Sequence, residues 1–185
     1  MIRKISEYIL KIWGWTIVGK IPVEKKYIII VAPHTSNWDY VVGQLFYFCH
    51  GMKAKVMIKK ELFYFPLGIL LRSFGGIPVD RHHKTDIVDQ MIRQFEINDS
   101  FVLTITPEGT RNKVREWKTG FHRIAIGANV PVLLGFFDYK RKLVGTDELI
   151  YMSGNLDADM KRIKEFYRNI HPKFPENFSV GDIDH

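Results

Sequence analysis

Apolar residues follow two different spacings along the chain, and the two alternate. Short continuous apolar runs predict buried strands at residues 27–32, 54–58, 101–106 and 132–137. Apolar residues at helical spacing predict helices at residues 38–50, 66–74, 85–98 and 121–128. Toward the end of the chain we expect an edge hairpin at residues 143–152, a helix from Asn155 or Asp157 to Ile170, and an irregular tail over residues 172–185.

This alternation of helix and strand predicts an α/β fold in a single domain. Consecutive elements of this kind favour a mixed, largely parallel sheet that is flanked by helices. The chain has 185 residues, of which 46% are hydrophobic, and this is enough for one sizeable core. No linker, repeat or low-complexity tract interrupts it. Ligands of open parallel sheets gather beyond the carboxyl ends of the strands, so a functional site is expected there.

Residues 1–22 have a different pattern from the rest of the chain. On a helical wheel, the basic residues of this segment share one side and its isoleucines lie on another. Such a helix can lie in a membrane interface, or it can pack on the domain as an ordinary helix. The segment lacks the cleavage site of an export signal, and its uncharged stretch is shorter than the about 20 apolar residues that span a bilayer. We expect an amphipathic membrane-interfacial segment at residues 1–22 and the main domain at residues 23–185.

The chain is basic, with 27 Lys and Arg against 20 Asp and Glu and a net charge of +7. Such a surface attracts anions, which include phospholipid headgroups, coenzyme A phosphates and nucleic acid. Nucleic acid is disfavoured because the aromatic residues do not interleave with basic ones in a base-stacking motif. Cys49 is the single cysteine, which excludes an internal disulfide and a cysteine-based zinc cluster. Adjacent His82 and His83 lack the partners of a metal site, so we expect neither a metal nor a bound cofactor.

The strongest candidate for chemistry is the pair His34-x4-Asp39, directly after the first predicted strand. Imidazole exchanges protons near neutral pH, which suits a base that activates an alcohol. If the residues between them form a turn, Asp39 can accept a hydrogen bond from one ring nitrogen of His34. That bond fixes the tautomer and leaves the other nitrogen free to take a proton. The spacing therefore indicates a His-Asp general base.

Two further segments carry charged side chains beside glycines. Arg81 ends a segment that contains Gly76, and a guanidinium can grip a phosphate through two parallel hydrogen bonds. Arg111 could bind the same phosphate, although either arginine could instead form a surface ion pair. Glu108 follows a predicted strand directly, as His34 does, so the two share one edge of the sheet if those strands are parallel. Its carboxylate suits orienting an acceptor or bracing the arginines.

The sequence contains no Gly-x-Ser-x-Gly turn that would present a serine nucleophile. Ser36 is too near His34 to attack comfortably, and it is expected to cap the following helix. These features argue against a covalent serine intermediate and favour direct attack by an acceptor hydroxyl that His34 activates. The developing oxyanion would need donors, such as backbone amides or the side chain of Lys59 or Lys60.

The order and spacing of these segments resemble the glycerolipid acyltransferase superfamily, and in particular its PlsC-like lysophosphatidic acid acyltransferases. His34-x4-Asp39 is similar to the first block of that family, although Pro33 stands where the family often has Asn or Ser. The other similar segments are Gly76 to Arg81, Thr106 to Arg111, the apolar stretch around Pro131, and Lys59-Lys60-Glu61-Leu62. The resemblance covers roughly residues 28–137.

The resemblance implies a glycerol-3-phosphate acyltransferase-like fold and an O-acyltransferase that works at the cytoplasmic face of the cell membrane as a peripheral protein. It implies acyl-CoA or acyl carrier protein as the donor and a lysophospholipid as the acceptor, most simply 1-acylglycerol 3-phosphate, which would give phosphatidic acid. Another acceptor, such as a lyso-ornithine lipid, and a noncatalytic module that binds anionic membranes remain open. By the resemblance, the catalytic pair is His34 and Asp39, and the substrate-binding residues are Lys60, Gly76, Arg81, Glu108, Gly109, Thr110 and Arg111.

Overall fold

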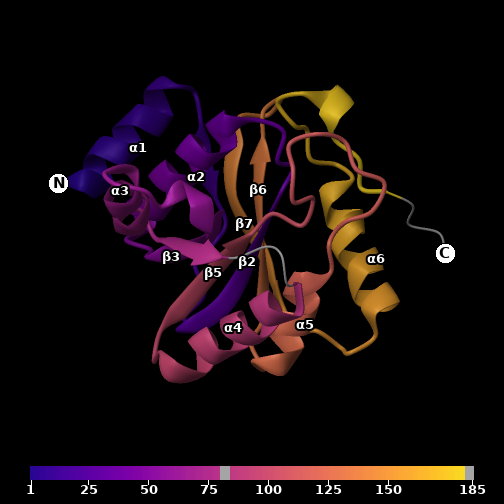
Figure 1. Cartoon of the computed structure of the whole chain (residues 1–185). Coiled ribbons are helices and arrows are strands. Elements are labelled where there is room, and N and C mark those ends of the chain that lie inside the picture. The colour runs from indigo at the N-terminus through magenta and orange to yellow at the C-terminus, as the bar shows by residue number, and fades with distance from the viewer. Residues whose placement is uncertain (80–83, 182–185) are drawn as a thin grey trace.

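The computed structural model describes residues 1–79 and 84–181. Within these residues, seven strands form one sheet in the order β1-β7-β6-β2-β5-β3-β4 (Figure 1). The strands are β1 (Thr16–Val18), β2 (Lys26–Ala32), β3 (Ala54–Lys59), β4 (Gly76–Val79), β5 (Phe101–Ile105), β6 (Val132–Asp138) and β7 (Leu143–Ile150). The helices are α1 (Ile2–Ile12), α2 (Asn37–His50), α3 (Leu67–Ser73), α4 (Lys84–Ile97), α5 (Gly120–Gly127) and α6 (Leu156–Tyr167), with short 3-10 helices η1 (Lys60–Leu62) and η2 (Pro175–Asn177).

The strands β2 to β6 all run in the same direction. β2 pairs in parallel with β5 and β6, and β3 pairs in parallel with β4 and β5. β7 returns antiparallel to β6, and the short β1 lies parallel to β7 at the sheet margin. The fold is therefore a single α/β domain with a mixed, largely parallel sheet, as the alternation of helix and strand predicted.

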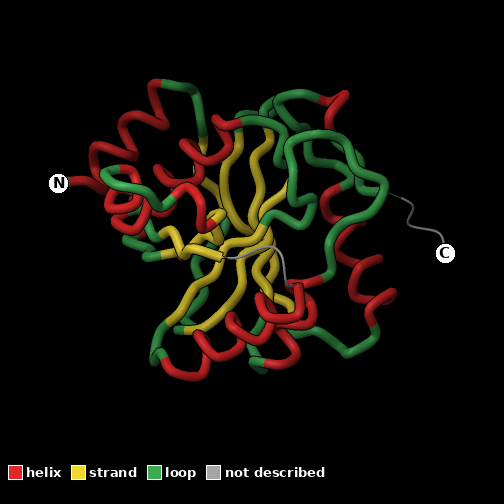
Figure 2. The backbone as a smooth tube through the Cα atoms, in the orientation of Figure 1, coloured by secondary structure: helices red, strands yellow, loops and turns green. Residues whose placement is uncertain are grey.

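Helices cover both faces of the sheet (Figure 2), and the residues of β2 alternate between the two cores. Ile28 and Ile30 pack with side chains of α4, α5 and α6 on one face. Ile29 and Val31 pack with side chains of α1 and α2 on the other. Because both faces are buried, β2 reads as a continuous apolar run instead of an alternating one.

The predicted strands and helices between residues 27 and 137 are present, and their ends agree within one residue. Asn155 caps α6 by accepting a hydrogen bond from the backbone amide of Ala158, and α6 ends at Tyr167, before the expected end at Ile170. No helix in the described part of the chain is both long enough and apolar enough to cross a bilayer.

Two strands were not predicted. β1 has three residues and lies within residues 1–22, where the helical spacing dominated; its pairing with β7 makes it a strand. β4 contains Gly76 and Pro78, which are poor strand formers, and it is tolerated because it lies at the sheet edge.

The expected hairpin at residues 143–152 is present, because this region pairs antiparallel with β6, but its expected position at the sheet edge was wrong. This region forms one strand, β7, whose hairpin partner is the preceding strand β6. It is not an edge strand, because β1 pairs with its other side. The sequence could not show this, since β1 is about 125 residues away along the chain and pairs through its backbone alone.

Candidate active site

Parallel pairing brings several sequence-distant loops to one edge of the sheet. His34 follows the carboxyl end of β2, Glu108 follows β5, and Tyr139 follows β6. β5 and β6 are the two neighbours of β2 and run parallel to it. The three residues therefore meet beyond the ends of adjacent strands, at the edge where ligands of open α/β sheets bind.

His34 and Asp39 form a hydrogen-bonded pair. The distance between His34 Nδ1 and Asp39 Oδ2 is 3.2 Å. Asp39 is buried, whereas 22% of the His34 side chain is exposed. Within the described residues, no hydrogen bond occupies Nε2 of His34. The imidazole is thus held by a buried carboxylate through one nitrogen and leaves the other available at the surface of the site.

The turn from β2 into α2 explains why Asp39 reaches back to His34. Asp39 is the third residue of α2, and its Oδ2 accepts the backbone amides of Thr35 and Ser36 at 2.9 and 2.8 Å. The Ser36 side chain caps the helix in return, which confirms the capping role expected for it. The same carboxylate therefore closes a capping box and orients the imidazole.

Tyr139 completes the surroundings of Asp39, and no spacing in the sequence pointed to it. Its hydroxyl donates to Asp39 Oδ1 at 2.6 Å across 100 residues of chain. Burial, and then the nearby Asp39 carboxylate, raise the pKa of Tyr139, so the hydroxyl keeps its proton and acts as the donor. The one available signal was its position directly after a strand adjacent to β2.

Replacing Tyr139 with phenylalanine tests this arrangement. The substitution leaves Asp39 Oδ1 without its donor while keeping the aromatic ring that packs edge-on against Trp15. We expect kcat to fall by about tenfold with little change in KM, because a hydrogen bond to a charged group is lost. The measurement is steady-state kinetics of the variant beside the parent chain. A parental kcat would argue against a role for Tyr139 in positioning Asp39.

Glu108 fixes the backbone of His34 from the neighbouring strand. The amide of His34 donates to Oε2 at 2.8 Å and to Oε1 at 3.2 Å. Burial raises the pKa of Glu108 to about 8, and the nearby Asp39 carboxylate adds to this rise, while the bond from the His34 amide opposes it. The two loops do share one edge, as expected. Glu108 is bonded to the His34 backbone, and within the described residues it forms no ion pair that would brace an arginine.

The raised pKa predicts a pH dependence of stability. Between 4.5, the ordinary value, and about 8, the folded chain holds a proton that the unfolded chain releases. The free energy of unfolding should therefore fall as pH rises through this window. Glu108→Gln keeps an oxygen for the His34 amide but loses the titration. Urea unfolding between about pH 5.5 and about pH 7.5 should show a slope less negative by up to about 1.4 kcal/mol per pH unit in the variant. Equal slopes would contradict the assignment.

Arg111 lies beside the turn from β2 into α2, residues 33–37. One of its guanidinium nitrogens donates to the Asn37 side chain at the start of α2. Gly109 has a φ of +66°, a left-handed conformation that favours glycine and turns the loop between Glu108 and Arg111. The Thr110 hydroxyl is used locally, accepting the Asn112 amide at 3.4 Å. The loop after β5, residues 106–111, thus brings Glu108 and Arg111 close to His34.

The structure shows no hydrogen bond or ion pair between the remaining predicted site residues and His34 or Glu108 in the part of the chain that it describes. Arg81 lies outside the described residues. Lys60 is exposed in η1, directly after β3 at the same sheet edge, and among the described residues it makes no hydrogen bond to His34 or Glu108. Gly76 is buried in β4, where a Cβ would lie 2.7 Å from the carbonyl oxygen of Leu71, so its described role is close packing.

A further cation near the pair was missed from the sequence. Lys173 Nζ lies 5.3 Å from the centre of the Trp38 ring and 6.0 Å from that of Tyr139. The amide of the next residue, Phe174, donates to the Thr35 hydroxyl at 3.3 Å. The segment after α6 therefore packs onto the turn from β2 into α2 and brings a positive charge with it.

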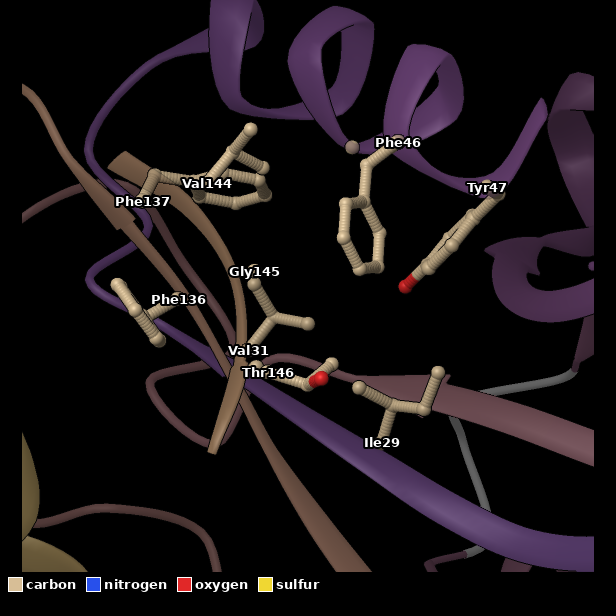
Figure 3. Close-up of a pocket in the computed structure, with 11 residues that line it drawn as sticks. Ile29, Val31, Phe46, Tyr47, Phe136, Phe137, Val144, Gly145 and Thr146 are labelled. Carbon is tan, nitrogen blue, oxygen red and sulfur yellow. The ribbon is translucent and has the colours of Figure 1, made fainter. Parts of the chain in front are cut away.

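An apolar cavity lies between α2 and the sheet (Figure 3). It is lined by Ile29, Val31, Phe46 and residues of β6 and β7, and its volume is about 10 Å³. A single water needs at least about 10–15 Å³ measured in this way. This cavity is far too small for a fatty acyl chain.

No metal site is evident in the described part of the molecule. Across residues 1–79 and 84–181, no three histidine, cysteine or carboxylate side chains are grouped so that they could hold a metal ion. The chemistry that the described groups can support is proton transfer by His34, oriented by Asp39.

Comparison with known proteins identifies the family of the chain. A family profile described as Acyltransferase matches residues 15–133, which is more than half of the chain and includes His34, Asp39 and Glu108. The chain belongs to the acyltransferase family. A sequence search among curated proteins returned no match.

The fold of this acyltransferase is also found in a solved structure. It is similar to the crystal structure of the 1-acyl-sn-glycerophosphate (LPA) acyltransferase, PlsC, from Thermotoga maritima, with a TM-score of 0.60. The match covers 92% of this chain and 80% of that chain at 17% sequence identity. At this identity the similarity establishes the fold.

Proposed function

We propose that this acyltransferase transfers a fatty acyl group from acyl-CoA or acyl carrier protein to the hydroxyl of a lysophospholipid. The favoured acceptor is 1-acylglycerol 3-phosphate, and the product would be phosphatidic acid. The observation that carries the proposal is the hydrogen bond between His34 Nδ1 and buried Asp39 Oδ2 at a sheet edge, within a chain of the acyltransferase family.

The proposed reaction is one direct transfer. His34 Nε2 takes the proton of the acceptor hydroxyl while its oxygen attacks the thioester carbonyl. The new C–O bond forms, the C–S bond breaks, and the imidazolium returns the proton to the leaving thiolate. Asp39 stabilises the imidazolium between these steps, and its fixed position keeps Nε2 as the reactive nitrogen.

The charges around the pair suit an anionic acceptor. The guanidinium of Arg111 lies next to Asn37, three residues from His34. Lys173 adds a cation over the rings of Trp38 and Tyr139. A phosphate held by Arg111, and by Arg81 as the family resemblance implies, would place the free hydroxyl of a lysophosphatidate toward His34.

The amphipathic helix α1 supports a peripheral location at the cytoplasmic face of the membrane. Its isoleucines Ile2, Ile5 and Ile12 are exposed, whereas Ser6 and Leu10 are its buried residues. An exposed apolar stripe beside basic side chains is typical of a helix that lies in an anionic membrane interface.

The test is turnover by the purified chain with a panel of acceptors and donors, followed by mass spectrometry. We expect labelled acyl chains to appear in phosphatidic acid when 1-acylglycerol 3-phosphate is supplied. The same reaction with monoacylglycerol, which lacks the phosphate, is the matched control and should be much slower. Preferred transfer to a lyso-ornithine lipid would replace the acceptor while keeping the mechanism. Vesicle binding without turnover for any pair would favour a noncatalytic membrane-binding module.

A further inference from the structure

The segment η1–α3, residues 60–74, exposes an unusual amount of apolar surface. Its exposed large apolar side chains are Leu62, Tyr64, Phe65, Ile69, Leu70 and Phe74. Phe65 is 84% exposed and Ile69 is 65% exposed. Contiguous exposed apolar side chains of this kind mark contact with a membrane or a partner, because isolated surface residues are common but clusters are not.

The backbone of the segment explains why these side chains point outward. A Cβ at Gly68 would lie 2.7 Å from the carbonyl oxygen of Phe63, and one at Gly76 would lie 2.7 Å from that of Leu71. The contact at Gly76 packs α3 closely against β4, whereas the contact at Gly68 is internal to the segment and packs α3 against the residues that precede it. Gly68 is the one buried residue of α3, so the larger side chains of this helix are left uncovered.

The apolar cluster is surrounded by positive charge. Residues 53–74 contain five basic side chains and one acidic side chain, Glu61. Lys59, Lys60 and Arg72 are exposed, and the described residues offer none of them a carboxylate partner in an ion pair. Exposed apolar side chains with cations beside them that lack carboxylate partners complement a bilayer with anionic headgroups, where each nearby basic residue adds to the binding.

α2 contacts both this segment and α1. α1 packs against α2, and the rings of Phe48 in α2 and Phe74 at the end of α3 lie 6.5 Å apart. Trp13, just after α1, contacts Trp38 of α2 edge-on at 5.7 Å, four residues from His34. The three helices lie on the same side of the molecule in Figure 1. The turn from β2 into α2, which carries His34, thus lies beside the end of α1.

We propose that η1–α3 is a second lipid-contacting element, which inserts its apolar side chains into an anionic bilayer beside α1. The inference rests on the proposed function, since it adds a second contact with the membrane that supplies the acceptor. Two separated contacts fix the orientation of a domain on a surface, whereas a single helix leaves it free to rotate. The second contact therefore holds the His34 edge toward the lipid.

The first test is binding to phosphatidylcholine vesicles that contain phosphatidylglycerol. The double variant Phe65→Ser/Ile69→Ser should lower the partition coefficient by about tenfold or more, because two large apolar side chains no longer leave water. The matched control is Ile97→Ser/Tyr151→Ser, which removes side chains that are 65% and 62% exposed at the end of α4 and after β7. The control should bind within about twofold of the parent chain. Equal binding by both double variants and the parent would overturn the proposal.

A second measurement does not depend on weakened binding. Cys49 is buried, so Ile69→Cys and Ile97→Cys can each be labelled with an environment-sensitive fluorophore. Adding vesicles should shift the emission of the label at position 69 to shorter wavelength and leave the label at position 97 unchanged. No shift at position 69 on bound protein would overturn the proposal. So would a dimer in solution that Phe65→Ser/Ile69→Ser abolishes without changing vesicle binding.

These results can be separated from the proposed function. Partitioning and fluorescence are measured without substrate, so an absence of acyl transfer does not affect them. Conversely, if η1–α3 does not touch lipid, turnover of a short-chain lysophosphatidate dissolved in water should still occur. Phe65→Ser/Ile69→Ser should turn over this dissolved acceptor at the parental rate and a vesicle-bound acceptor about tenfold more slowly.

Discussion

Replacing His34 with alanine is expected to lower kcat by about 10²- to 10⁴-fold, the usual contribution of a positioned general base. The hydroxyl of the acceptor would then have no group to take its proton as it attacks the thioester. KM should change little, because the groups expected to hold the phosphate are untouched. The measurement is steady-state transfer of a labelled acyl chain to a lysophospholipid. Transfer at the parental rate would refute the mechanism.

A second His-Asp pair provides the control for this experiment. His122 of α5 and Asp159 of α6 are both buried, and their Nε2 and Oδ2 atoms lie 2.8 Å apart. This pair joins two helices on the opposite face of the sheet from α2. We expect His122→Ala to lower the melting temperature while leaving kcat near the parental value. His34→Ala should show the reverse pattern, with a much lower kcat and little change in melting temperature, because the His34 side chain is partly exposed.

Replacing Asp39 with asparagine is expected to lower both activity and stability. Both carboxylate oxygens accept hydrogen bonds from donors, Oδ2 from Thr35, Ser36 and His34, and Oδ1 from Tyr139. An amide nitrogen in either place would face a donor. We expect kcat to fall by about 10²- to 10⁴-fold because the imidazole loses its fixed tautomer. The free energy of unfolding should fall by about 1–3 kcal/mol because buried donors lose their acceptor.

These two losses can be separated experimentally. The kcat of Asp39→Asn should be measured well below its melting temperature, where the variant is folded, and expressed per folded molecule. Ser36→Ala is a useful comparison, because it removes the other half of the capping box but leaves the His34–Asp39 bond. It should cost about 1 kcal/mol of stability and leave most of the activity. A variant Asp39→Asn with parental kcat in its folded state would contradict the role of Asp39.

The short-range parts of the site could be predicted from the sequence, because they depend on a few consecutive residues. His34, Ser36 and Asp39 are separated by one turn of chain after a strand, so the capping box and the imidazole–carboxylate bond follow from local geometry. The apolar run of β2 marked the strand that positions them. The expected meeting of His34 and Glu108 required one further assumption, that their two strands are parallel, and the pairing of β2 with β5 confirmed it.

Long-range contacts decided the rest. The role of Glu108 was predicted as contact with an acceptor or with arginines, but in the structure its carboxylate accepts the backbone amide of His34. Every residue except proline carries the same backbone amide, so the sequence does not indicate which amide a carboxylate will bind. The same reason explains why β1 was missed, since three residues became a strand only by pairing with β7.

By itself, the sequence determined the α/β class, the order of most helices and strands, and the His34–Asp39 pair, because hydrophobic periodicity and helix capping act over a few residues. The tertiary structure alone decided that Tyr139 holds the second oxygen of Asp39 and that Lys173 lies over the neighbouring rings. It also decided that α3 turns its apolar side chains outward. Those features depend on which strands become neighbours and which surfaces remain uncovered, and both are set only when the whole chain has packed.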